Sequence, residues 1–162
     1  MVDYTPSHVG ICVRDLDRSL RFYCDGLGFT AGERHELDSA SVPGLDLAME
    51  LRADAAMTSQ FVERDGVRIE LLSFREPGTV GSPSARRNQL GLTHLCLAVA
   101  DVDVAAERLL EYGGLVLDRT RQHIAGADVL FVMDPDGVRI ELMRRPRSAG
   151  SGSGAGVPGT GV

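Results

Sequence analysis

The stretch Asp65-Gly66-Val67-Arg68-Ile69-Glu70-Leu71 occurs twice, because residues 136–142 repeat every one of its residues in the same order. Each copy starts with the turn dipeptide Asp-Gly and continues with strict alternation of apolar and charged side chains. This pattern is typical of a β-strand that leaves a hairpin with one face in a core. The repeat therefore predicts two equivalent modules, each containing such a strand.

A histidine stands at the head of another apolar run in each half, His8 in the first and His94 in the second. Because side chains alternate along a strand, each histidine lies opposite the apolar residues of its own run. Glu70 and Glu141 likewise lie opposite the Val-Ile-Leu face of the repeated strand. If helices cover the apolar faces, all four polar side chains converge on the concave side.

Turn residues and apolar periodicity predict the order β-α-β-β-β in each half. Asp15 and Asp101 or Asp103 are expected to cap the two helices, and Gly26 and Gly113 to stop them. The strands are expected at 7–14, 29–37, 58–63 and 67–74 in the first half, and at 93–100, 115–121, 129–134 and 138–144 in the second, with helices starting at 16 and 102.

The first half contains an insertion, at about 38–57, that the second half lacks. Its apolar residues fit two patterns, since Leu45, Leu47, Met49 and Leu51 alternate as in a strand, whereas Leu45, Met49 and Ala53 follow a helical period. Both interpretations stay open. The expected organisation is a first module at 1–74, a linker rich in Gly and Pro at 75–91, a second module at 92–147, and a disordered Gly/Ser-rich tail at 148–162.

Composition restricts the class of protein. The chain has 162 residues, of which 43% are hydrophobic and 25% charged, and it contains no apolar run long enough to span a membrane. A net charge of −6 without a basic block argues against nucleic acid as the main partner. Three cysteines without a CxxC spacing favour reduced thiols, and the start of the chain does not resemble a signal peptide, so a cytoplasmic location is expected.

The tandem order, with His on the first strand and Glu on the fourth, resembles the vicinal oxygen chelate superfamily, which includes glyoxalase I, methylmalonyl-CoA epimerase, extradiol dioxygenases and fosfomycin and bleomycin resistance proteins. The most specific stretches are 8–23, 94–103 and 131–142. The resemblance implies an α+β fold, in which two tandem βαβββ modules form a cupped, partly open β-barrel. It also implies one metal ion at the floor of the cup.

His8, Glu70, His94 and Glu141 match the positions where metal-binding members of this family keep their ligands. Two imidazoles and two carboxylates suit one divalent ion of Ni, Zn, Co, Mn or Fe and leave positions open for substrate oxygens. Solvent-facing charges and ordinary strand histidines would explain any one of the four, but four in register favour a metal site.

The full ligand set resembles that of glyoxalase I and of the epimerase, which implies a lyase or isomerase acting on a small carbonyl compound through an enediolate. In glyoxalase-like members a ligand glutamate moves the proton, so Glu70 and Glu141 are the catalytic candidates. The position four residues after the first His, an Arg that holds glutathione in glyoxalase I, is here Cys12. Glu50 matches the epimerase's additional base if it lies on a strand, and is a surface charge if it follows a helix.

Further side chains are candidates for the substrate pocket, although surface or core positions explain them as well. His123 stands near a strand end, and Arg68 and Arg139 share a face with the glutamates. The expected substrate-binding residues are Cys12, Phe61, His123, Phe131 and Met133.

Two other functions remain open. One is an extradiol-type dioxygenase using Fe²⁺ at the same site, and the other is a non-catalytic protein that binds a small toxic compound. A homodimer is expected, because the 75–91 linker is long enough for modules to pair within or between chains.

Overall fold

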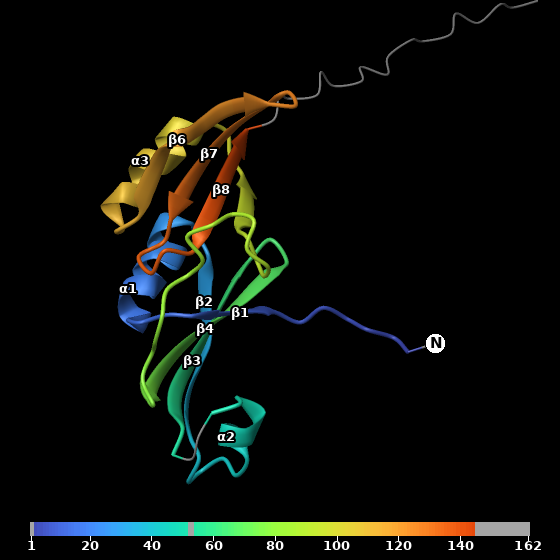
Figure 1. Cartoon of the computed structure of the whole chain (residues 1–162), viewed down its shortest axis with the longest axis vertical. Helices are drawn as coiled ribbons and strands as arrows, with labels where there is room; N and C mark the ends of the chain where they lie inside the picture. Colours follow the sequence, from blue (N-terminus) through green and yellow to red (C-terminus); the bar gives the residue numbers. More distant parts are fainter. Residues whose placement is uncertain (1, 52–53, 145–162) are drawn as a thin grey trace, which may run out of the picture.

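A computed structural model of the chain describes residues 2–51 and 54–144. These residues form two four-stranded sheets with equivalent strand orders (Figure 1). The first sheet contains β1 (Val9–Cys12), β4 (Val67–Glu76), β3 (Ala56–Arg64) and β2 (Thr30–Asp38), in that order. The second contains β5 (Leu95–Ala98), β8 (Arg139–Arg144), β7 (Ala127–Met133) and β6 (Leu115–Ile124).

In both sheets the first strand of the module is parallel to the fourth, and the remaining pairs are antiparallel. The predicted α+β class and the tandem βαβββ arrangement are therefore confirmed. Among the described residues the two sheets are not joined edge to edge, so they do not close into one barrel. β1 and β5 are left as edge strands.

One helix in each module begins at a capping aspartate, as predicted. The Asp15 carboxylate accepts a hydrogen bond from the backbone N–H of Arg18 at the start of α1 (Leu16–Leu20). The Asp101 carboxylate does the same for α3 (Val102–Glu111). The first helix continues as a π-helix, η1 (Arg21–Gly26), which a period of 3.6 residues does not predict.

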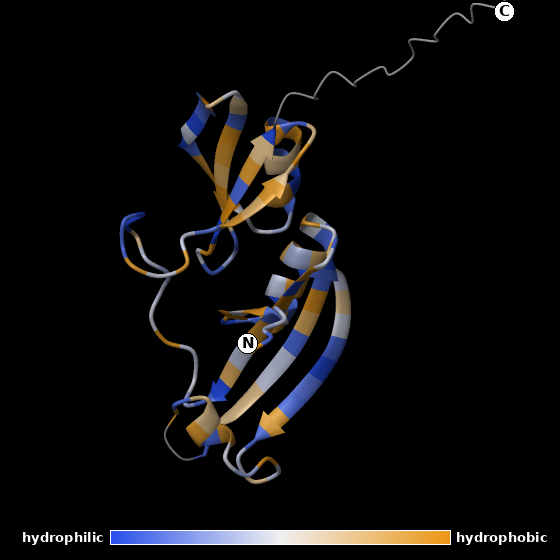
Figure 2. Ribbon diagram, turned by 90° about the vertical axis from the view of Figure 1, so that its right-hand side faces the viewer, coloured by the Kyte–Doolittle hydropathy of each residue, from blue (hydrophilic) through white to orange (hydrophobic). Residues whose placement is uncertain are grey.

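The convex faces of the sheets share one apolar core with the helices. Figure 2 shows the alternation of hydrophobic and hydrophilic residues along the strands. Residues from both modules belong to a single cluster, which includes Val13, Phe22, Tyr23, Val62, Ile69, Leu71, Leu109, Leu130, Val132, Ile140 and Leu142. A Cβ at Gly114 would lie 3.0 Å from the Phe22 ring and 2.8 Å from the Leu109 carbonyl oxygen, so only glycine permits this close packing of the modules.

Polar contacts also join the two modules. The Tyr23 hydroxyl donates to the buried Asp134 carboxylate at 3.0 Å, and Asp134 also accepts the backbone N–H groups of Asp136 and Val138. Burial raises the pKa of Asp134 above its ordinary value, and burial beside Asp134 raises the pKa of Tyr23 well above 10. Arg18 pairs with Asp136 at 2.6 Å. The halves therefore form one folded unit.

The insertion of the first module contains a short helix, α2 (Leu45–Ala48), so the strand interpretation of this segment is wrong. Leu45 packs with Ala55 and Met57, and partly buried Leu72 and Phe74 join this second cluster. Strand alternation places Leu72 and Phe74 on the same face as Glu70. The insertion therefore covers one end of the concave face of the first sheet.

The predicted disordered tail, 148–162, lies outside the described residues. Among those that the structure describes, no helix is long and apolar enough to cross a membrane.

Candidate metal centre

The first half of the candidate site is a contact between β4 and the residue just before β1. The His8 Nε2 and Glu70 Oε2 atoms are 3.2 Å apart. The His8 Nδ1 lies 3.0 Å from the Ser7 hydroxyl, and the ring meets Phe61 edge to face at 5.4 Å between centroids. Phe61 lies opposite Glu70 in the β3–β4 register, so it holds the histidine beside the glutamate.

The second half repeats this arrangement. The His94 Nε2 and Glu141 Oε2 atoms are 2.8 Å apart, and the His94 Nδ1 lies 2.8 Å from the Thr93 hydroxyl. The His94 ring meets Phe131 edge to face at 5.4 Å, and Phe131 lies opposite Glu141 in the β7–β8 register. The sequence repeat is therefore also a repeat of side-chain geometry.

Each pair has the chemistry of half a metal site. Two donor atoms on adjacent positions of an octahedral ion, with bonds of about 2.1 Å, are roughly 3 Å apart, close to the separations observed here. In both pairs the Nδ1 atom is engaged by a hydroxyl and the Nε2 atom faces the carboxylate, which is the orientation a ligand histidine needs. The imidazole and carboxylate donors thus fit a borderline divalent ion.

The four predicted ligands are brought together only as two pairs. No three His, Cys, Asp or Glu side chains within 2–51 and 54–144 form a group that could hold a metal ion. His8 and His94 have side chains 37% and 31% exposed, so neither pair is enclosed by its own module. Each pair therefore lacks further donors.

The two pairs differ in how the glutamate is held. The Ser59 hydroxyl donates to Glu70 Oε1 at 2.5 Å. In the second module Val129 occupies the matching place, because Ser59 pairs with Leu72 across the β3–β4 ladder and Val129 pairs with Met143 across β7–β8. Glu141 consequently has no counterpart of the Ser59 hydroxyl bond.

His35 on β2 lies on the same concave face as the His8–Glu70 pair, and the sequence analysis did not identify it. It lies opposite Ser59 in the register, and its ring is 6.3 Å from that of Phe61. The alternation of β2 could have placed it on this face, but only the register with β3 brings it beside Phe61. The concave face of the first sheet therefore carries a second imidazole near the His8–Glu70 pair.

Two arginines stack on the two phenylalanines. The Arg68 guanidinium lies 4.0 Å from the centre of the Phe61 ring, and that of Arg87 lies 3.7 Å from the centre of Phe131. Arg139, which matches Arg68 in the repeat, instead donates to the backbone carbonyls of Ser84 and Ala85. Burial and the neighbouring charge of Arg139 lower the pKa of Arg87, and the charge of Glu141 opposes this shift.

Four of the predicted pocket residues lie on the concave faces. Cys12 pairs with Leu72 and therefore shares the face of Glu70. Phe61 and Phe131 contact the two histidines, and Met133 follows Phe131 by two residues on the same face of β7.

His123 and Glu50 lie away from the two pairs. His123 pairs with Asp128, and Asp128 pairs with Arg144, which alternation places on the α3 side of the sheet, opposite Glu141. The His123 Nδ1 lies 2.7 Å from Asp128, whose pKa is lowered by that bond and by Arg144. Glu50 follows α2 with φ 54° and is exposed, so it is a surface charge.

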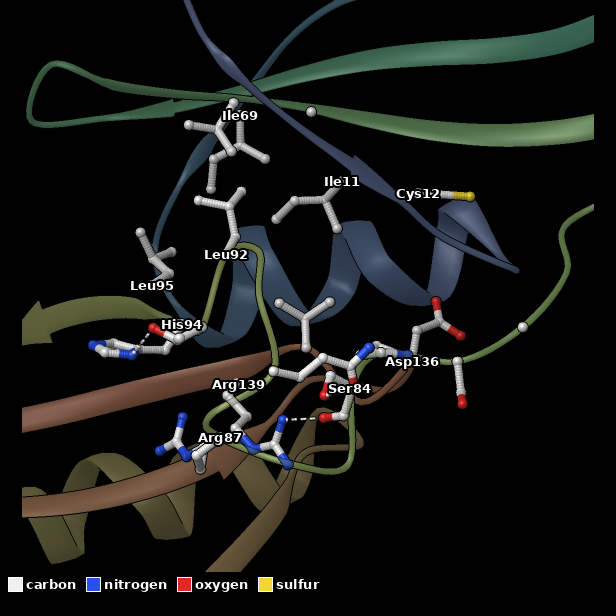
Figure 3. Close-up of a pocket in the computed structure, with 18 of the residues that line it drawn as sticks. Ile11, Cys12, Ile69, Ser84, Arg87, Leu92, His94, Leu95, Asp136 and Arg139 are labelled. Carbon is white, nitrogen blue, oxygen red and sulfur yellow. Dashed lines mark hydrogen bonds between the residues drawn. The ribbon is translucent and has the colours of Figure 1, made fainter. Parts of the chain in front are cut away.

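A cavity of about 480 Å³ lies between the modules, beneath the linker (Figure 3). Its walls come from β1, β4, the linker and the start of β5, and they include Ile11, Ile69, Leu92 and Leu95. His94 and Arg87 lie at its edge. The cavity thus lies between β1 and the start of β5, the edge strands that His8 and His94 immediately precede.

Residues 5–142 match the family profile described as Glyoxalase/Bleomycin resistance protein/Dioxygenase superfamily. A catechol-2,3-dioxygenase of Bacillus subtilis is 31% identical over 88% of the chain, but the chain spans only 43% of that relative's length. A probable lactoylglutathione lyase of Synechocystis is 30% identical over 85% of the chain and 92% of the relative. A solved structure of a glyoxalase family protein from Bacillus cereus aligns with a TM-score of 0.71 at 21% identity, covering 86% and 92% of the two chains.

Proposed function

The chain belongs to the Glyoxalase/Bleomycin resistance protein/Dioxygenase superfamily, the vicinal oxygen chelate group that its sequence resembles, and from this premise we propose that it is a metal-dependent lyase or isomerase. It would move a proton next to the carbonyl group of a small molecule. The observation that carries the proposal is the repeated His–Glu contact, with Nε2–Oε2 distances of 3.2 and 2.8 Å. A relative named as a lyase supports the reaction class.

The proposed ligands are His8, Glu70, His94 and Glu141, which together would hold one divalent ion of Ni, Zn, Co, Mn or Fe. When bound, the ion would supply the positive charge that stabilises the negative charge developing on the substrate oxygens. Each half contributes one neutral imidazole and one carboxylate, so the four side chains leave positions for those oxygens.

Glu141 is the proposed proton carrier. A carboxylate that moves a proton must turn away from its other contacts, and the Ser59 hydroxyl holds Glu70 at 2.5 Å. Glu141 has Val129 at the matching position and lacks that restraint. This difference supports the proposal that Glu70 stays a ligand while Glu141 moves the proton.

We further propose that a second copy of the chain completes each site. The His–Glu pairs lie beside the edge strands β1 and β5, which have no strand neighbour on one side among the described residues. The linker between them exposes Leu90 and Leu92 almost completely, with 100% and 86% of their surface accessible. In a two-fold dimer, β1 of each copy would lie beside β5 of the other and form two equivalent four-ligand sites.

A subunit-mixing experiment tests the metal site and the dimer together. His8→Ala and His94→Ala are each expected to lose the metal, which elemental analysis measures. Chromatography with light scattering measures whether each variant is still a dimer. Refolding an equimolar mixture should restore about a quarter of the wild-type metal, because half of the dimers are mixed and one site in each has four intact ligands. Recovery of no metal would contradict sites shared between chains, and a metal-free wild type after reconstitution would contradict the whole proposal.

An extradiol-type dioxygenase is the second candidate, because a relative named catechol-2,3-dioxygenase is 31% identical. Two histidines and one carboxylate are enough for the Fe²⁺ site of such enzymes. Fe²⁺-dependent uptake of O₂ with catechol would favour this function. Turnover of 2-oxoaldehyde adducts or acyl thioesters, with other divalent ions, would favour the lyase or isomerase. Recovery of every tested compound unchanged would favour a binding protein.

A further inference from the structure

The concave face of the first sheet carries a cation beside the proposed metal ligands. Arg68 precedes Glu70 by two residues on β4, and alternation places both on one face. The Arg68 guanidinium lies 4.0 Å from the centre of the Phe61 ring, whose edge contact with His8 holds the first pair. A single aromatic ring thus positions both a proposed ligand and a fixed positive charge.

The second half also has an arginine stacked on its phenylalanine, but this arginine comes from a different segment. Here the arginine that matches Arg68 in the repeat, Arg139, donates to the backbone carbonyl of Ser84 (Figure 3) and to that of Ala85. The linker itself supplies Arg87, which lies 3.7 Å from the centre of Phe131. The stacked guanidinium therefore occurs in both halves, although in the second half it comes from the linker and not from the residue equivalent to Arg68.

Neither stacked arginine forms an ion pair within 4.0 Å in the part of the chain that the structure describes, although the charge of Glu141 acts on Arg87. Other arginines of the same chain pair with carboxylates, as Arg18 does with Asp136 and Arg144 with Asp128. For Arg68 and Arg87 no such ion pair exists among residues 2–51 and 54–144. A guanidinium stacked on a ring keeps its in-plane N–H donors free for a planar anion.

We propose that Arg68 and Arg87 bind an anionic oxygen group of the substrate, a carboxylate or a phosphate, next to the proposed metal. The inference rests on the proposed function and names its substrate class, a small carbonyl compound that also carries a negative charge. Two residues along a strand span roughly 7 Å, which sets the separation between the anionic group and the oxygens near Glu70. The two cations would also offset the repulsion between such a substrate and two glutamates.

The probes for a test are two small hydroxamates, which chelate divalent ions through two oxygens. Acetohydroxamate carries no further charge, and the monohydroxamate of succinic acid adds a carboxylate. A third probe replaces that carboxylate with a phosphonate. Their dissociation constants are measured by calorimetry on the metal-loaded, full-length protein, so the readout does not depend on knowing the substrate.

The wild type is expected to bind an anionic probe roughly 10- to 100-fold more tightly than acetohydroxamate, the usual range for a hydrogen bond to a charged group. Arg68→Met and Arg87→Met should each remove much of that preference while leaving acetohydroxamate binding and metal content unchanged. Arg68→Lys should restore only part of it, because an ammonium cannot bind the group bidentately. The stronger of the two anionic probes identifies carboxylate or phosphate.

Arg21→Met is the matched control, since Arg21 is an exposed arginine of η1 on the helix side of the sheet. It should keep the full preference for the anionic probe. Equal binding of charged and uncharged probes by the wild type would overturn the inference, as would a preference that survives both Arg68→Met and Arg87→Met. If Arg68→Met does not fold, Arg87→Met decides, because Arg87 lies outside both sheets. A wild type that takes up no metal would instead remove the proposed function, and this inference with it.

Discussion

The His8–Glu70 and His94–Glu141 pairs occupy the same places in their modules, but the residues around them differ. In the first module the Ser59 hydroxyl holds the glutamate, and the insertion with α2 covers the far end of the concave face. In the second, Val129 stands at the place of Ser59 and the linker contributes Arg87. The two modules thus share the His–Glu pair but differ in the residues around it. Under the proposed function, the two halves would both supply metal ligands but would differ in how the glutamate and the nearby arginine are held.

The largest expected difference between the halves concerns turnover. Glu141→Gln should lower kcat about 10²- to 10⁴-fold, the usual contribution of a general base, because Glu141 is the proposed proton carrier and has Val129 at the place of Ser59. Glu70→Gln should lower it much less, because Glu70 is held by Ser59. Steady-state kinetics with the substrate found by screening, at equal metal content, measures both. Equal losses would mean that the two glutamates do not divide the roles.

Metal removal tests whether both pairs hold the same ion. A ligand at 100 to 1,000 times its Kd stabilises the native state by about 3–4 kcal/mol, so EDTA should lower the Tm by several degrees. His8→Ala and His94→Ala should each abolish this response completely. If either variant retained part of the EDTA effect in differential scanning fluorimetry, each pair would bind an ion of its own.

The insertion is expected to matter for the first half only. Leu45 is 7% exposed and anchors the small cluster with Ala55 and Met57. Leu45→Ala should cost about 2–3 kcal/mol of unfolding free energy, as in other buried Leu→Ala changes. Urea unfolding measures this cost, and elemental analysis should still find metal at the wild-type level. The matched control is Leu47→Ala, because Leu47 is 79% exposed and should change stability very little.

The smallest expected effect lies at the junction of the modules. Tyr23→Phe removes the donor to Asp134 and should cost about 1–2 kcal/mol at pH 7. The cost should shrink near pH 4, because a hydrogen bond to a protonated carboxyl group is weaker than one to a carboxylate. Urea unfolding of variant and wild type at both pH values tests this, and an equal cost at both would contradict it.

The raised pKa of Asp134 gives the same junction a second pH signature. The native state binds this proton more tightly than the unfolded state, so the stabilising contribution is complete below the ordinary pKa and is lost as pH rises through the raised value. Asp134→Asn replaces the carboxyl group with an amide that does not titrate in this range. The stability of this variant relative to wild type should therefore improve between pH 4 and pH 7.

Local sequence signals predicted most of the fold, because strand alternation and helix capping depend only on residues close together in the sequence. The alternation in 65–71 and 136–142 located β4 and β8, and Asp15 and Asp101 located the helix starts. The insertion was ambiguous for the same reason, since a short apolar run fits both periods until its contacts are known. Leu45 settles it by packing on Met57, a long-range contact that periodicity does not contain.

The sequence by itself determined that His8, Glu70, His94 and Glu141 lie on strand faces opposite the apolar residues, because strand alternation and an exact repeat fix which residues share a face. Only the tertiary structure decided that these residues meet as two pairs, that His35 and Arg87 join them, and that His123 faces the opposite side. Strand register and the path of the linker set these contacts. Both depend on how distant segments pack together, and a one-residue change of strand register would turn His35 or His123 to the other face.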